Sequence, residues 1–384
     1  MDSKENTPNL SENGKPVITI TQISRPFFTH SEISYMHSQT IDESKKLQYN
    51  QTKYQIFQLL YQVIKQLKFP LRVLATAMNY YQRFYLFHKF DGAFDDMDKD
   101  PYVVAITCLL LASKNEDCIK KLKDLQSVVN KLRDIDENKP VTNTLDSSGD
   151  SIAYHELQRK YVLATEFKLL QLIKFDFSNG ANSLSIKTSV DCLLVQFCKQ
   201  LDINYRMSIL SWLICFDIMS TPLCLVIPPH CIAVAIIIIS LNLKPQEIKL
   251  DHHEIGEEDD DERLSEILDS IDCERDFKCP EVLVNEGILY ILDYYIHQYS
   301  HSVLNNYLPA IDKQLGKEQI FKFMELKEKF IDLKNMNETS CKESLNRTDE
   351  YLSKWEFTTA SKGIARFMLG NKRRRFNKEL DIQG

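Results

Sequence analysis

Cysteine and histidine most often build reactive or metal-binding sites, and this chain has ten cysteines and nine histidines. No two cysteines form a CxxC pair, and no ligands stand at the usual zinc spacing. Several cysteines lie inside apolar segments, as reduced thiols of an intracellular protein do. The paired histidines, His252–His253 and His297 with His301, are expected at the surface. We therefore expect no metal ion and no cofactor.

Motifs of catalysis are also missing from the sequence. It has no Gly-rich phosphate loop, no HRD or DFG motif of a protein kinase, and no GxSxG nucleophile turn. The sequence therefore favours a protein that acts by binding rather than an enzyme.

Two charged residues stand in apolar surroundings. The run from Val103 to Ala112 is too short to span a bilayer and predicts a helix buried on nearly every side. Charged residues follow it, and Lys114 suits the negative C-terminal end of the helix dipole. Glu166 is an acid inside a second, largely apolar segment. These residues alone leave three roles open: a solvated lysine, a Lys114–Glu166 ion pair, or contacts to a partner protein.

Helical segments must position these charges, and the apolar spacing predicts five of them in the first half. They cover residues 54–67, 71–90, 101–117, 119–132 and 154–175, with a polar loop insertion at 133–152. A further short helix is expected after Arg25, where Thr29 and Glu32 form a capping box and two phenylalanines anchor the preceding tail.

A second set of helices follows, again with one hydrophobic helix preceded by proline. The predicted helices are 185–200, 207–219, 232–243 and 282–299, with an acidic loop at 251–263. Pro228, Pro229 and His230 interrupt the apolar run, so we expect no membrane span. The two sets indicate an internal repeat and an all-α fold.

The overall charge and the two ends of the chain limit the function further. The net charge is -7, so no basic field favours nucleic acid. Residues 1–24 are polar, indicate a disordered tail and do not form a signal peptide. Residues 317–334 predict an amphipathic helix that either packs on the second set or binds another subunit. The basic cluster Lys372, Arg373, Arg374 and Arg375 is either a nuclear-localisation signal or a solvated tail.

Several ordered segments resemble the cyclin family. ATAMNYYQRFY (75–85), CLLLASKNED (108–117), KKLKDL (120–125) and EFKLLQLIKFDF (166–177) are similar to the first cyclin box. STPLCLVIPPHCIAVAI (220–236) resembles the third helix of the second box. The resemblance implies the cyclin fold, two tandem five-helix bundles. The boxes would cover 25–180 and 181–300, with a C-terminal extension from 301 to 384.

The sequence looks most like the transcriptional cyclins (the T, K, C and L group), and among them the beta subunits of fungal CTD kinase I. This resemblance implies a nuclear regulatory subunit of a cyclin-dependent kinase that phosphorylates the C-terminal repeat domain of RNA polymerase II and promotes elongation. It also implies a third, gamma subunit. Kinase contacts would fall on Lys114, Glu116, Glu166, Leu170, Phe175 and Phe177.

Two alternatives remain open at this point. One is a nucleic-acid-binding cyclin fold similar to general transcription factor IIB, which needs a basic face and usually an N-terminal zinc ribbon. The other is a cell-cycle cyclin. The first long helix, YQIFQLLYQVIKQL (54–67), lacks the MRxxLxxW pattern of that class.

Overall fold

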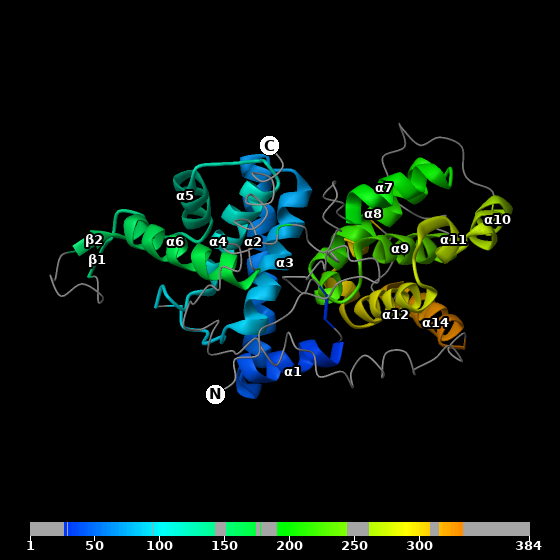
Figure 1. The fold of residues 1–384 in the computed structure, drawn as a ribbon, viewed down its shortest axis with the longest axis horizontal. Helices are drawn as coiled ribbons and strands as arrows, with labels where there is room; N and C mark the ends of the chain where they lie inside the picture. Colours follow the sequence, from blue (N-terminus) through cyan, green and yellow to red (C-terminus); the bar gives the residue numbers. More distant parts are fainter. Residues whose placement is uncertain are drawn as a thin grey trace, which may run out of the picture.

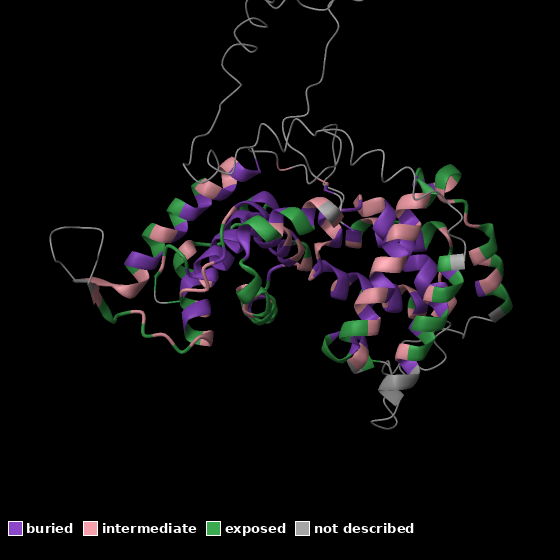
Figure 2. Ribbon diagram, turned by 90° about the horizontal axis from the view of Figure 1, so that it is seen from below, coloured by how far each residue is buried: buried purple, intermediate pink, exposed green. Residues whose placement is uncertain are grey.

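The computed structural model describes residues 27, 28, 30–94, 96–142, 151–173, 177, 190–243, 261–307 and 315–332. Two groups of helices lie side by side along the long axis of the molecule (Figure 1). Buried residues fill the interior of each group (Figure 2). The all-α fold expected from the sequence is confirmed.

The first group surrounds one central helix. Its elements are α1 (His30–Thr40), η1 (Glu43–Lys45), α2 (Lys46–Leu67), α3 (Leu71–Phe87), α4 (Pro101–Asn115), α5 (Leu122–Leu132) and α6 (Tyr154–Leu172). α4 packs against α2, α3, α5 and α6. Nearly all its residues are buried, because its apolar side chains face neighbours in every direction.

Local signals fix where α4 begins and ends. Asp100 caps its N-terminus by accepting a hydrogen bond from the Tyr102 amide at 2.9 Å, and Pro101 occupies the first turn. At the other end Asp117 adopts a left-handed φ of 55°, and the Cys118 amide donates to the Ser113 carbonyl at 2.9 Å. The chain therefore turns sharply after Glu116, and α5 starts three residues later than predicted.

The polar insertion is not a simple loop, which corrects the sequence prediction. Pro140–Thr142 (β1) pairs antiparallel with Ser151–Ala153 (β2), with Val141 opposite Ile152. Residues 143–150 lie outside the described part of the chain. β-branched residues in each segment suit these short strands, which the surrounding polar sequence concealed.

The second group repeats the arrangement around α9, which is buried along most of its length. Its elements are α7 (Val190–Gln200), α8 (Tyr205–Met219), η2 (Pro222–Leu225), α9 (Pro229–Leu243), α10 (Asp261–Ser270), α11 (Cys273–Phe277) and α12 (Glu281–Gln298). Two short helices, α10 and α11, occupy the place of a single fourth helix, and the sequence prediction missed both. α10 has few apolar residues and α11 is a single turn.

The N-terminal segment joins the two groups. The amide of Phe28 donates to the Leu225 carbonyl at 2.7 Å, while its buried ring packs edge-on against Phe87. Next to this contact, Gln82 of α3 donates to the Thr221 carbonyl at 3.1 Å. Phe28 therefore anchors the N-terminal segment as expected, and it does so at the junction between the groups.

The C-terminal helix packs back on the second group. η3 (Tyr299–His301) and α13 (Leu304–Tyr307) lead from α12 to α14 (Leu315–Asp332), which lies along α12. The buried ring of Phe323 stacks on Tyr295 with centroids 4.9 Å apart, and Lys327 pairs with Asp293. The amphipathic helix predicted here is confirmed. The basic cluster at 372–375 lies outside the described residues.

None of the helices in the described part of the chain combines the length and apolar character needed to cross a bilayer.

Candidate functional site

An ion pair at one end of α4 holds the two charged residues that the sequence analysis singled out. Lys114 Nζ lies 2.6 Å from Glu166 Oε1 and so connects the last turn of α4 to the middle of α6. The lysine side chain is 44% exposed and the glutamate side chain 11%. The sequence left an ion pair and a partner contact as alternatives. The ion pair is present, and the exposure of Lys114 leaves donors of its ammonium group accessible to a partner.

Glu116 points into the first group rather than out of it. Its side chain is buried, and it accepts a hydrogen bond from Thr76 Oγ1 at 2.8 Å. Arg72 Nε lies 3.7 Å from its second carboxylate oxygen. Arg72 itself is exposed and also approaches Cys118 Sγ at 3.7 Å. Glu116 therefore orients Arg72 at the surface, a role that the sequence did not reveal.

Asn115 is a buried polar residue next to Lys114 at the end of α4. Its Nδ2 donates to the buried Tyr80 hydroxyl at 3.1 Å. This bond satisfies two buried polar groups and fixes the end of α4 on α3, which holds Lys114 in place.

Apolar side chains flank the ion pair on α6. Leu163 is 46% exposed and Phe167 is 51% exposed. Together with the half-buried Leu170 they follow one side of the helix at helical spacing. The sequence analysis singled out Leu170 but missed the other two. The signal was available, since apolar residues of α6 lie on more than one side of the helix and one group can bury only some of them.

The remaining predicted contacts lie beyond the end of α6. Phe177 is half-buried and packs against the hydrophobic core. Phe175 lies outside the described residues. We call the surface formed by Lys114, Glu166, Leu163, Phe167 and Leu170 the α4–α6 surface.

The α4–α6 surface is built for recognition rather than for bond chemistry. A lysine ammonium can donate to the free carbonyl groups at the C-terminal end of a partner helix, and the glutamate can accept from backbone amides. The exposed leucine and phenylalanine are suitable anchors for an apolar helix face. Among the described residues, the three neighbouring side chains that could hold a metal ion, His230, Cys231 and Cys279, lie in the second helix group and not at this surface.

Comparison with known families and structures agrees with this architecture. The family model for the cyclin N-terminal domain matches residues 24–178, which include α1 to α6. The CTD kinase subunit beta of Saccharomyces cerevisiae is 29% identical over 304 residues, covering 79% of each chain. The first helix group is a cyclin N-terminal domain.

Two more similarities extend the match across both helix groups. The chain is 28% identical over 310 residues to the CTD kinase subunit beta of Schizosaccharomyces pombe, covering 80% of this chain and 77% of that one. A chain in the crystal structure of the yeast RNA Pol II CTD kinase CTDK-1 complex superposes with a TM-score of 0.60 at 28% identity. That superposition covers 80% of this chain and 84% of the other chain. The second helix group is therefore part of the shared fold.

Proposed function

We propose that this cyclin is the non-catalytic regulatory subunit of a cyclin-dependent kinase that phosphorylates the C-terminal repeat domain of RNA polymerase II and so promotes transcription elongation. The observation that carries the proposal is similarity over about four-fifths of the chain to CTD kinase beta subunits of two yeasts. A CTD kinase complex contains a chain of the same fold.

Activation follows from the way a protein kinase assembles its site. The kinase needs an ion pair between a strand lysine and a glutamate on its C-helix, and that helix must lie inward. A cyclin that binds only the inward position shifts the kinase population towards the active form. On the α4–α6 surface, Lys114 and Glu166 bind the polar end of this helix, and Leu163, Phe167 and Leu170 contact its apolar face.

The ion pair also prepares the surface for binding. Lys114 has a long flexible side chain, and fixing it costs rotamer entropy of up to about 2 kcal/mol. Because Lys114 is already bonded to the largely buried Glu166, part of this entropy is lost before the kinase binds. Glu116, Phe175 and Phe177 complete the proposed contact region, with Glu116 acting through Arg72.

Two further features belong to the same proposal. The outer side of α14 exposes Phe321, Met324 and Ile331, while Phe323, Leu326 and Phe330 are buried. This outer side is the candidate surface for a third, gamma subunit. The cluster Lys372, Arg373, Arg374 and Arg375 is the candidate nuclear-localisation signal for a protein that acts on nuclear RNA polymerase II.

Co-purification from the native cells tests the function. The tagged wild-type chain should bring down a cyclin-dependent kinase, together with a small third subunit. Lys114→Glu and Glu166→Lys should lose the kinase. Two matched charge changes on exposed residues of the second group, Lys199→Glu and Glu266→Lys, should keep it. Recovery of DNA or promoter factors without any kinase would contradict the proposal and favour a role like that of general transcription factor IIB.

A further inference from the structure

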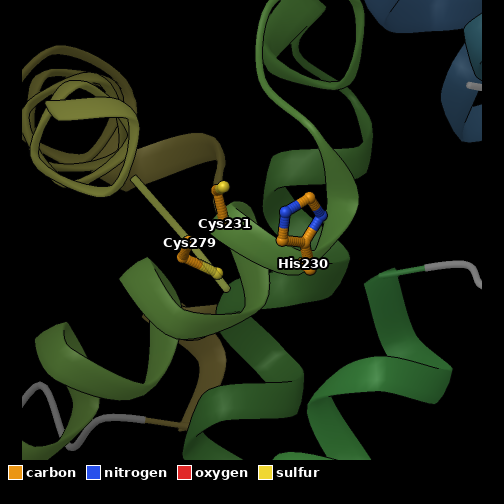
Figure 3. Close-up of side chains that lie close together, drawn as sticks. All are labelled: His230, Cys231 and Cys279. Atoms are coloured by element: carbon orange, nitrogen blue, oxygen red, sulfur yellow. The ribbon is translucent and has the colours of Figure 1, made fainter. Parts of the chain in front are cut away.

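Three metal-ligating side chains meet in the second helix group, outside the proposed kinase surface. His230 and Cys231 lie in the first turn of α9, and Cys279 lies in the short link between α11 and α12. Their ligand atoms all lie within 4.8 Å of one another. Figure 3 shows the side chains of His230, Cys231 and Cys279 close together near the start of α9.

We propose that His230, Cys231 and Cys279 bind one Zn²⁺ ion through two thiolates and one imidazole nitrogen, with a water molecule as the fourth ligand. The function proposed for the α4–α6 surface neither requires nor predicts this site.

The spacing of the ligand atoms fits the size of the ion. A point no more than about 2.8 Å from all three atoms exists when none of them is more than 4.8 Å from another. Zinc bonds are about 2.3 Å to sulfur and about 2.0–2.1 Å to nitrogen. Each ligand atom therefore has to move inward by roughly half an ångström, which a small rotation of a cysteine or histidine side chain provides.

The chemistry of the ligands selects a soft metal ion. Two thiolates and an imidazole suit Zn²⁺ and exclude Mg²⁺ and Ca²⁺, which prefer oxygen ligands. Both cysteines are fully buried and His230 is half-buried. Two thiolates balance the charge of Zn²⁺, so the bound site is neutral overall and its burial avoids the cost of an isolated ion.

The surroundings favour the thiolate that zinc binding requires. The first turn of α9 provides the positive end of a helix dipole, which favours a thiolate. Both thiols must release their protons to the solvent when the metal binds. Zinc binding should therefore weaken as the pH falls.

A metal at this position would tie together the starts of two core helices. α9 is the buried centre of the second group, and α12 packs against both α9 and α14. The ion would connect the first turn of α9 directly to the link that leads into α12. It would therefore stabilise the second group without taking part in any reaction. The sequence did not reveal the site because Cys279 is distant from Cys231 along the chain and the adjacent His230–Cys231 pair matches no zinc motif.

Metal analysis of the purified full-length chain tests the proposal. After dialysis against metal-free reducing buffer, we expect close to one zinc per chain by elemental mass spectrometry. Cys231→Ser and Cys279→Ser should each reduce this content at least tenfold. The matched control Cys192→Ser, which changes an exposed cysteine on α7, should leave it unchanged. Removing zinc with a chelator should lower the Tm of the wild type and leave the Tm of Cys279→Ser unchanged.

A second measurement uses the wild-type chain, so its result does not depend on how well the cysteine variants fold. The wild-type chain stripped of metal and refilled with Co²⁺ should show thiolate-to-cobalt charge-transfer absorption, and His230→Ala should alter the accompanying visible bands. Absence of this absorption, zinc content below a tenth per chain, or full zinc retention in Cys279→Ser would each overturn the proposal. A disulfide between Cys231 and Cys279 in freshly purified protein would overturn it as well. None of these results bears on kinase binding.

Discussion

Reversing both charges of the Lys114–Glu166 pair separates its structural role from its proposed role in kinase binding. Lys114→Glu and Glu166→Lys each break the pair that joins α4 to α6 at 2.6 Å. The double variant Lys114→Glu/Glu166→Lys restores an ion pair of the same two groups with its polarity inverted. The stability of the folded chain depends on whether the two side chains form an ion pair. Binding of a partner helix depends on which of the two positions carries the positive charge.

The structure sets the magnitudes of the two effects. Lys114 is partly solvated, so the pair itself contributes up to about 1 kcal/mol. Leaving a charge at the largely buried position 166 without a partner, the Glu166 carboxylate in Lys114→Glu or the new ammonium group in Glu166→Lys, costs about 1–3 kcal/mol more. Each single variant should therefore lower the free energy of unfolding by roughly 1–4 kcal/mol. The double variant should recover all but about 1 kcal/mol, since the exchanged side chains differ in length.

The two single variants and the double variant should change the affinity for the kinase in a different pattern from the stability. Removing one partner of a charge-assisted contact across an interface typically costs about 2–4 kcal/mol, which is roughly a 30- to 1,000-fold increase in Kd. We expect this loss in both single variants and also in the double variant. Urea denaturation reports stability, and calorimetric titration with the purified kinase reports Kd. Recovery of wild-type Kd by the double variant would refute the proposed contact and leave the pair with a structural role alone.

Three further predictions concern other parts of the molecule. Phe167→Asp should abolish kinase binding with less than about 1 kcal/mol change in stability, because the ring is exposed; a stable variant that still binds would argue against the apolar contact. Phe323→Ala should destabilise the chain by about 3–5 kcal/mol and expose α14 to limited proteolysis, since Phe323 is fully buried against Tyr295; an unchanged digestion pattern would count against this packing. Burial raises the pKa of Asp217 to about 6 from its ordinary 3.8, so the folded state keeps a proton that the unfolded chain loses first. Relative to Asp217→Asn, wild-type stability in urea should therefore fall by about 3 kcal/mol from pH 3.5 to pH 7; parallel pH profiles would contradict it.

The central helices of the two groups could be predicted because their signals are local. Asp100 and Pro101 mark the start of α4, and Pro229 marks the start of α9. Lys114 and Glu166 stood out because a charge next to or within an apolar helix needs a partner. The structure places both together, which spacing along one chain did not reveal.

The features that escaped prediction depend on contacts between distant segments. Glu116 is buried, accepts a hydrogen bond from Thr76 of α3 and lies beside the exposed Arg72, an arrangement that the sequence did not reveal. The β1–β2 hairpin forms by pairing across residues 143–150, which a helix-based reading of the polar insertion could not find. The exposure of Leu163 and Phe167 depends on which side of α6 the first group covers.

Kinase activation is the central claim, and a reconstituted assay tests it most directly. The purified kinase partner would be assayed on a peptide of the RNA polymerase II repeat, alone and with saturating cyclin. We expect negligible activity from either protein alone, strong phosphorylation with the wild-type cyclin, and a loss of most of this stimulation with the charge-swapped double variant. Full activity of the kinase without the cyclin would contradict the claim.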